Sequence, residues 1–378
     1  MNRYLSSSLL LTVLALLGIG VVQVYSSSYV FAIETYNDGL FFFKRQLLFA
    51  AIALIVMVAV IQIPFEWIRR YAWLLWVASA VGILLTLVPG LGVRVGGAYR
   101  WLQMPFGFRV EPAEFMKLGF VCLMATLISR YKGFQLKRML VWSVALILPL
   151  MFLLKQPDFG TFVLLVAVGF GLLFAFGLPW SVIVVSAAVA IPTFYALVMN
   201  VGYRRARVLA FLDPWSEAHQ KGFQAIQSML SFHAGGIWGT GLGQGQGKLF
   251  FLPEAHTDFT LAVLGEEMGF VGVLVVMSLF SYLVFRCFQL SLKTEDRFKK
   301  AMALGIALVF GLTVVINAGM AMGLLPTKGM ALPFLSYGGS SLVASCLMFG
   351  LMLNLENEIL NGNPNRHRMA KILRETLP

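Results

Sequence analysis

Long apolar segments alternate with short polar ones along the whole chain. A membrane-spanning helix needs ~20 mostly apolar residues. Ten segments approach this length, at about residues 5–33, 46–63, 71–88, 112–130, 139–154, two within 159–203, 259–285, 302–324 and 338–355. The run 159–203 carries no charge and divides at Gly177-Leu-Pro179. The pattern predicts an all-α integral membrane protein, with residues 1–378 forming a single polytopic bundle of about ten transmembrane helices.

Basic residues decide the predicted orientation of these helices. Arg3, four basic residues in 130–138, five in 286–300 and four in 366–374 all fall on one side of a ten-helix topology. The positive-inside rule makes that side cytoplasmic. Both termini are then cytoplasmic, with a cytoplasmic tail at about 356–378. A large external loop, about 204–258, lies between helices 7 and 8. Long loops translocate largely regardless of charge, so its arginines do not oppose this topology.

Composition agrees with a membrane protein. Hydrophobic residues make up 59% of the chain and charged residues 12%, against ~25% charged in soluble domains. The net charge of +12 would suggest nucleic-acid binding in a soluble domain. Here basic loops that hold the topology and meet anionic lipid account for it, and we expect no nucleic-acid partner. The three scattered cysteines form no pattern typical of a disulfide or metal site.

The strongest candidate chemistry lies where the external loop meets the eighth span. This boundary carries Glu254, His256 and Asp258, and the span itself carries Glu266 and Glu267. Acidic groups at or inside a bilayer are costly and by default functional. Thr257 or Asp258 could instead cap the helix, because a carboxylate is favoured at a helix N-terminus. The density of polar groups favours function, with Asp258 at its centre.

Other charged residues stand at the starts of two further spans. Glu114 and Lys117 are three positions apart, so they share one helix face. They form either an orienting salt bridge or a lysine held ready for an anionic group. Lys155 and Asp158 flank the start of the sixth span, where an interface anchor with an N-cap is the simpler alternative to a binding role.

Arginines on the external side suggest an anionic ligand, because the positive-inside rule disfavours them there. They are Arg100 and Arg109 before the fourth span, and Arg204, Arg205 and Arg207 after the seventh. The glycine-rich run 235–247 does not bind a nucleotide. It fits neither phosphate-loop pattern, because position 242 is Leu rather than Gly and no strand precedes it.

Several motifs resemble those of the SEDS family (shape, elongation, division, sporulation). They are Arg100-Trp-Leu, Glu111-Pro-Ala-Glu-Phe-Met-Lys, Gln156-Pro-Asp-Phe-Gly-Thr, Arg207-Val-Leu-Ala-Phe-Leu-Asp-Pro, Phe251-Leu-Pro-Glu-Ala-His-Thr-Asp-Phe, Gly265-Glu-Glu-Met-Gly and Gly323-Leu-Leu-Pro-Thr-Lys-Gly-Met-Ala-Leu-Pro-Phe-Leu-Ser-Tyr-Gly-Gly-Ser-Ser. The resemblance covers nearly the whole chain. Ala255 and Thr327-Lys-Gly are more similar to the FtsW division branch than to the RodA elongation branch.

The resemblance implies a peptidoglycan glycosyltransferase at the bacterial cytoplasmic membrane, at the division site for the FtsW branch. Its substrate would be lipid II, a disaccharide-pentapeptide on undecaprenyl pyrophosphate. Its partners would be a class B penicillin-binding protein and other division proteins. The family's essential aspartate matches Asp258, and its glutamate and lysine of the fourth span match Glu114 and Lys117. Ser336 and Ser340 of the last motif join the predicted substrate-binding residues.

The predicted chemistry needs one base and several cations. Asp258 would take the proton of the acceptor hydroxyl, with inversion at the anomeric carbon. The pyrophosphate would be held by the basic residues Lys117, Arg100, Arg109, Arg204, Arg205 and Arg207. A divalent cation, Mg²⁺ or Mn²⁺, is a candidate cofactor. A lipid II flippase, an elongation-type polymerase or a scaffold for a transpeptidase are the alternative functions, and Glu254, Glu266 and Glu267 are assigned only a supporting role.

Overall fold

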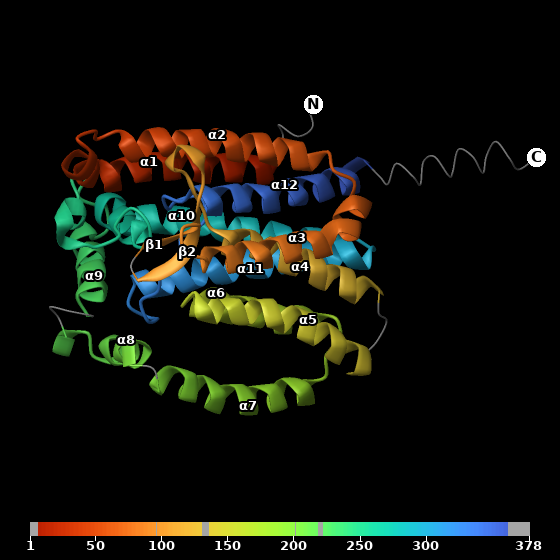
Figure 1. The fold of residues 1–378 in the computed structure, drawn as a ribbon. Coiled ribbons are helices and arrows are strands. Elements are labelled where there is room, and N and C mark those ends of the chain that lie inside the picture. The colour runs from red at the N-terminus through yellow and green to blue at the C-terminus, as the bar shows by residue number, and fades with distance from the viewer. Residues whose placement is uncertain (1–6, 96, 131–135, 201, 218–221, 362–378) are drawn as a thin grey trace, which may run out of the picture.

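The computed structural model describes residues 7–95, 97–130, 136–200, 202–217 and 222–361, which form a bundle of helices with a small sheet at one end (Figure 1). The expected spans fall on α1 (Ser8–Tyr36), α2 (Phe41–Ile61), α3 (Phe65–Thr86), α4 (Pro112–Arg130), α5 (Leu136–Lys155), α6 (Phe159–Ala175), α7 (Trp180–Met199), α10 (Thr260–Lys293), α11 (Arg297–Ala321) and α12 (Gly339–Asn361). Within the described residues, seven of these helices are long and apolar enough to cross a membrane. The protein is therefore a multi-pass membrane protein.

Helix α4 lies at the centre of the bundle. Its side chains are buried along most of its length, from Pro112 to Ile128. Helices α3, α6, α11 and α12 pack around it, whereas α2 and α3 leave many large apolar side chains exposed, as suits a lipid-facing surface. Glu114 and Lys117 of α4 therefore lie inside the protein and do not face lipid.

A three-stranded antiparallel sheet, which the all-α prediction does not include, forms in the connection before α4. Its strands are β1 (Gly92–Val95), β2 (Ala98–Gln103) and β3 (Arg109–Val110), in the order β1-β2-β3. A 3-10 turn (Pro105–Gly107) joins β2 to β3, and a bulge interrupts β1 between Val93 and Arg94. The valines and aromatic residues of this segment favour strands. The all-α prediction therefore applies to the spans and not to this connection.

The long connection before α10 is largely helical. It contains α8 (Gly202–Leu212), a 3-10 turn (Trp215–Glu217), α9 (Phe223–Gly235) and a π-helical turn (Gly247–Phe251). Helix α9 packs on α10 and α11, whereas the main contacts of α8 are with α7 and the 3-10 turn. Figure 1 shows α7 and α8 standing apart from the central helices. Within this connection, α9 is thus fixed to the bundle, whereas α8 lies beside it.

The two ends of the described chain lie at one end of the bundle. The Ser7 hydroxyl donates to the Glu356 carboxylate, and the Tyr282 hydroxyl of α10 donates to Ser8 at 2.6 Å. The first and last described helices, α1 and α12, therefore meet at this end of the bundle. The tail beyond residue 361 lies outside the described residues.

Candidate functional site

Asp258 lies in a tight turn that leads into α10. Glu254 has a left-handed backbone, with φ of 57°. Its carbonyl accepts hydrogen bonds from the N–H groups of Thr257, Asp258 and Phe259 at 3.2, 3.1 and 3.2 Å. Helix α10 begins at Thr260, with Phe259 at the N-cap and no side-chain cap. The interpretation of Thr257 or Asp258 as the cap is therefore wrong, because the helix starts later. The Thr257 hydroxyl donates to the Glu254 carboxylate at 2.7 Å instead.

The Asp258 carboxylate and the Arg100 guanidinium meet beside Gly329. A Cβ atom placed on Gly329 would lie 3.1 Å from Asp258 Oδ2 and 3.6 Å from Arg100 Nη1. A side chain at this position would crowd both groups. The second terminal nitrogen of the Arg100 guanidinium fixes the side chain in place, because Nη2 donates to the Pro157 carbonyl at 2.8 Å. Strand β2 thereby brings a fixed cation close to Asp258.

Glu114 and Lys117 form an ion pair inside the bundle. Lys117 Nζ lies 2.5 Å from Glu114 Oε1. The lysine side chain is only 5% exposed and the glutamate side chain 12%. Burial makes such a charge-assisted hydrogen bond stronger than it would be in water. Both alternatives raised for these residues, an orienting salt bridge and a prepared cation, are compatible with this geometry.

Glu111 adds a carboxyl group next to this pair. Its N–H donates to the Ser340 hydroxyl at 2.9 Å, which fixes the start of α4 to the start of α12. Burial, followed by the nearby carboxylates of Glu114 and Asp158, raises the pKa of Glu111 from 4.5 to about 8, against the opposing effect of Arg100 and Lys117. At neutral pH this group therefore holds its proton, whereas an exposed glutamate would not.

Asp158 is the N-cap of α6, as the sequence suggested. Its carboxylate accepts a hydrogen bond from Thr161 N–H at 3.2 Å. Burial alone would raise its pKa, but Lys328, Arg100 and the Thr161 N–H lower it below the ordinary value. Asp158 is thus a buried carboxylate held in its charged form by two cations and a helix end.

These residues form one charged cluster, which we call the central cluster. It consists of Arg100, Glu111, Glu114, Lys117, Asp158, Asp258 and Lys328. The members come from β2, from α4 and the residue directly before it, and from three turns that precede α6, α10 and α12. Three cations and four acids meet where the connections cover the end of the bundle. The arrangement can bind an anionic group beside a carboxylate that accepts a proton.

His256 points away from the central cluster into aromatic side chains. Its ring lies 5.3 Å from that of Phe31, 4.8 Å from Phe42 and 6.0 Å from Tyr337, between ring centroids. Its carbonyl accepts the Tyr337 N–H at 2.9 Å. Burial lowers the pKa of His256, and the Glu254 carboxylate opposes this. The described contacts of His256 anchor the turn of Asp258 to α1, α2 and the connection before α12.

The two predicted serines also make structural contacts. Ser336 accepts a hydrogen bond from Leu332 N–H at 2.9 Å and one from the Thr260 hydroxyl at 3.3 Å. Ser340 accepts the Glu111 N–H, as described above. Both hydroxyls therefore hold the turns around the central cluster in place.

Three of the remaining predicted cations, Lys155, Arg109 and Arg205, are exposed and do not join the central cluster. Lys155 is exposed at the end of α5, and Arg109 is exposed on β3. Arg205 is exposed on α8, away from the bundle. Arg204 and Arg207 lie on the same helix, but their side chains lie outside the described residues. Among the described cations, the central cluster uses those of β2, α4 and the connection before α12.

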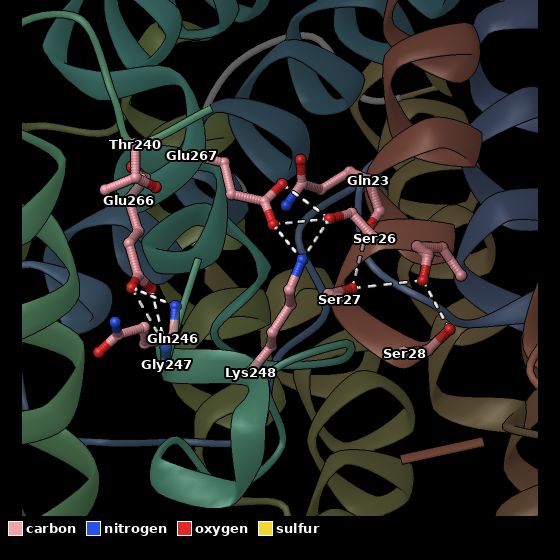
Figure 2. Close-up of polar contacts among 11 residues, drawn as sticks. Gln23, Ser26, Ser27, Ser28, Thr240, Gln246, Gly247, Lys248, Glu266 and Glu267 are labelled. Carbon is pink, nitrogen blue, oxygen red and sulfur yellow. Dashed lines mark hydrogen bonds and ion pairs between the residues drawn. The ribbon is translucent and has the colours of Figure 1, made fainter. Parts of the chain in front are cut away.

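Glu266 and Glu267 fasten the glycine-rich run to α10 (Figure 2). The Glu266 carboxylate accepts hydrogen bonds from Gln246 N–H at 2.6 Å and from Gly247 N–H at 3.1 Å. Glu267 forms a buried ion pair with Lys248 at 2.6 Å, and Ser26 of α1 donates to it at 2.6 Å. Their predicted supporting role takes this specific form: they anchor the start of the segment that ends at Asp258.

The backbone of the glycine-rich run also follows a break in α10. Gly269 has φ of 66° and ψ of −168°, which are not helical values. Phe270 N–H donates to the Gly236 carbonyl at 2.9 Å, and Thr240 N–H donates to the Glu266 carbonyl at 2.9 Å. The run is therefore a tightly bound turn packed against α10, and its glycines allow the backbones to approach closely.

Sequence reasoning did not single out several residues of this region. Lys328 and Glu111 stood inside recognised motifs but were not selected. Asn317, a fully buried amide in the apolar run of α11, donates to the carbonyls of Asp258 and Met330 at 3.1 and 2.6 Å. A polar side chain within a span is a usable signal for function. Lys248 gave no such signal, because its partner Glu267 is identifiable only in the folded protein.

The described residues offer no group of three or more His, Cys, Asp or Glu side chains arranged to hold a metal ion. The acids of the central cluster are interleaved with cations, which compete with a metal for them. A divalent cation does not fit these side chains as a bound cofactor. Any such ion would need ligands from a substrate.

The chain matches one family model over most of its length. The family described as cell cycle protein, FtsW/RodA/SpoVE, matches residues 7–360. A curated relative from Trichlorobacter lovleyi, named probable peptidoglycan glycosyltransferase FtsW, is 44% identical over 351 residues. The alignment covers 92% of each chain.

Two solved structures share the fold. One belongs to a study titled structural coordination of polymerization and crosslinking by a peptidoglycan synthase complex. It is 27% identical, with a TM-score of 0.75, over 93% of this chain and 97% of the other. The other is the rod shape determining protein RodA of Thermus thermophilus, 26% identical with a TM-score of 0.68, over 93% of this chain and 96% of the other.

Proposed function

The chain belongs to the FtsW/RodA/SpoVE family of cell cycle proteins, and from this membership we propose that Asp258 is the general base of its peptidoglycan glycosyltransferase reaction. The FtsW-named relatives support a glycosyltransferase of cell division. The observation that carries the assignment of Asp258 is its place beside Gly329, facing the Arg100 guanidinium. A proton acceptor and an anion-binding group thus stand within one small space.

The proposed reaction is a displacement at the anomeric carbon of the donor sugar. The hydroxyl oxygen of the acceptor sugar attacks this carbon, and its proton passes to the Asp258 carboxylate. The bond from the anomeric carbon to the pyrophosphate oxygen breaks, and the lipid pyrophosphate leaves with the electron pair. A single displacement inverts the configuration. One carboxylate suffices because pyrophosphate leaves without protonation.

The central cluster supports this reaction electrostatically. Charge develops on the pyrophosphate as the bond breaks, and cations already in place stabilise it without reorganisation. Arg100 is oriented by the Pro157 carbonyl and Lys117 by Glu114. Glu111 adds little repulsion while it is protonated, because its pKa lies at about 8. We propose lipid II as the donor and acceptor.

The partners and the location of the reaction are also proposals. One solved relative belongs to a complex that coordinates polymerization and crosslinking. We propose that this chain works with a crosslinking partner of the class B penicillin-binding protein type, together with other division proteins at the division site. Any Mg²⁺ or Mn²⁺ would enter with the substrate phosphates, and no step above depends on it.

The test is polymerisation of purified lipid II by the purified full chain, alone and with a class B partner. We expect wild type to extend glycan strands and Asp258→Asn to lose about 10²- to 10⁴-fold in rate, the usual contribution of a base. Asp38→Asn, at a side chain that is 40% exposed, is the matched control and should retain the rate. Polymerisation by Asp258→Asn at the wild-type rate would overturn the assignment.

A further inference from the structure

Lys328 reaches the start of α6 from the connection that precedes α12. Its side chain lies directly over Gly160, where a Cβ atom would fall 1.6 Å from both Cε and Nζ. The next residue, Gly329, is the one that faces Asp258 and Arg100. Lys328 is therefore the chain neighbour of the residue that faces the proposed catalytic carboxylate, and its ammonium lies among the charges of Asp158, Lys117, Arg100 and Glu114 in the central cluster.

The Lys328 ammonium is buried and has no hydrogen-bond partner among the described residues. The other two cations of the cluster do have partners, since Lys117 binds Glu114 and Arg100 binds the Pro157 carbonyl. Asp158 lies near Lys328, but its carboxylate caps α6. Within the part of the chain that the structure describes, the three N–H donors of Lys328 are thus unused.

A buried ammonium that makes no hydrogen bond is costly for the fold. Removing it from water is unfavourable without hydrogen-bond acceptors, and the positive end of α6 is a poor neighbour for a cation. Burial lowers the pKa of Lys328 from 10.5 to about 8, with Asp158 opposing this and Lys117 and Arg100 adding to it. A residue that the fold retains at such a cost is typical of a binding site.

We propose that Lys328 binds a phosphate oxygen of the donor's pyrophosphate, so that its ammonium gains its missing acceptors only when the substrate is present. The inference rests on the proposed function and extends it to a residue outside the predicted set. Lys328 is better suited than Lys117 to bind this phosphate oxygen. Lys117 would have to give up its ion pair with Glu114, whereas Lys328 loses no hydrogen bond to a described residue. An oxygen of the leaving group bound here would also lie close to Arg100.

A structural role would give the opposite effect on stability. If Lys328 served mainly as the counter-ion of Asp158, its removal would leave a buried carboxylate uncompensated and destabilise the protein. If Lys328 is instead retained for a ligand, Lys328→Met removes a buried charge that makes no hydrogen bond within the described residues. Arg100 and the Thr161 N–H still stabilise the Asp158 carboxylate, so the ligand-free protein becomes no less stable. Lys117→Met is the comparison, because it separates Glu114 from its partner and should lower the melting temperature.

The experiment combines melting temperatures with binding of undecaprenyl pyrophosphate to the purified full chain in detergent. Undecaprenol, which has no phosphate, is the parallel probe. We expect Lys328→Met to melt at or above the wild-type temperature and to bind the pyrophosphate lipid about tenfold or more weakly, the loss of one charged hydrogen bond. Its binding of undecaprenol should not change. Lys328→Arg, which keeps the charge, should retain more of the pyrophosphate affinity than Lys328→Met.

Two results would overturn the proposal. One is a melting temperature lowered as much in Lys328→Met as in Lys117→Met, which would make Lys328 structural. The other is wild-type affinity of Lys328→Met for undecaprenyl pyrophosphate. Because binding is measured directly, the outcome is distinct from that of the polymerisation assay. A wild-type protein that binds the lipid without polymerising would contradict the proposed function and leave the role of Lys328 supported.

Discussion

Asn317 holds the backbone of Asp258 from a neighbouring helix. Its Nδ2 donates to the Asp258 carbonyl at 3.1 Å and to the Met330 carbonyl at 2.6 Å, and the side chain is fully buried. One amide of α11 therefore joins the turn of the proposed base to the connection that carries Lys328 and Gly329. The position of the carboxylate depends on this contact as well as on its own helix.

Asn317→Leu should reduce lipid II polymerisation more than it reduces stability. The change leaves two buried carbonyls without a donor, at a cost of about 1–3 kcal/mol each. A misplacement of ~1 Å at a reacting group can cost about 100-fold in rate. The measurements are the polymerisation rate and the melting temperature.

Asn354→Leu is the matched control for this change. Asn354 of α12 donates to the carbonyls of Val60 and Ile63 at 3.4 and 2.7 Å, near the end of the bundle that holds the chain termini. It should cost comparable stability and leave polymerisation intact. Equal losses of activity in the two variants would count against a positioning role for Asn317.

Lys248→Met should strongly destabilise the protein, because it leaves the Glu267 carboxylate buried without its cation. Breaking a buried ion pair costs about 3–5 kcal/mol. Lys44→Met, which breaks an exposed pair with Asp38 (61% and 40% exposed), should cost about 0–1 kcal/mol. Unfolding in detergent measures both. Adding Glu267→Met to Lys248→Met should recover much of the loss, and no recovery would mean that the pair is not the source of the effect.

Gly269→Ala should disrupt the attachment of the glycine-rich run to α10. The added Cβ would lie 2.4 Å from Gly239 N and 2.5 Å from the Ile237 carbonyl oxygen, and φ is +66°. Both contacts are with backbone, so we expect a loss of ~2 kcal/mol or more. Gly18→Ala, with open space around the new Cβ, should be neutral or stabilising, because alanine favours helices. A Gly269→Ala protein as stable as Gly18→Ala would show that the two backbones separate freely.

Glu111→Gln should stabilise the protein increasingly as the pH rises. The folded pKa of about 8 exceeds the ordinary 4.5 because of burial. The stability contributed by this proton is therefore complete below about pH 4.5 and is lost as the pH rises through about 8. Glutamine is neutral throughout, so its advantage in melting temperature should widen across this window and then level off. Glu66→Gln, at an exposed carboxylate of α3, controls for the loss of one negative charge. A constant difference between pH 5 and 8 would contradict the raised pKa.

The helices and their approximate ends were predictable because hydropathy and helix punctuation are local. Helix α4 begins at Pro112 as expected, and the break at Gly177-Leu-Pro179 falls between α6 and α7. Residues Glu114 and Lys117 could be paired in advance, because three positions along a helix place two side chains on one face. Asp258 could be selected because a carboxylate at the edge of a membrane is costly.

The partners of the other buried charges were decided only by tertiary structure. Ser26 and Glu267 are separated by 241 positions, and Lys328, in the connection before α12, meets the first turn of α6. Such contacts depend on how helices and connections pack, which no local pattern encodes. The sequence by itself thus determined a membrane bundle with a carboxylate at one edge. The packing determined which cations reach that carboxylate, which glutamates anchor its turn, and that the Lys328 ammonium is buried without a hydrogen bond among the described residues.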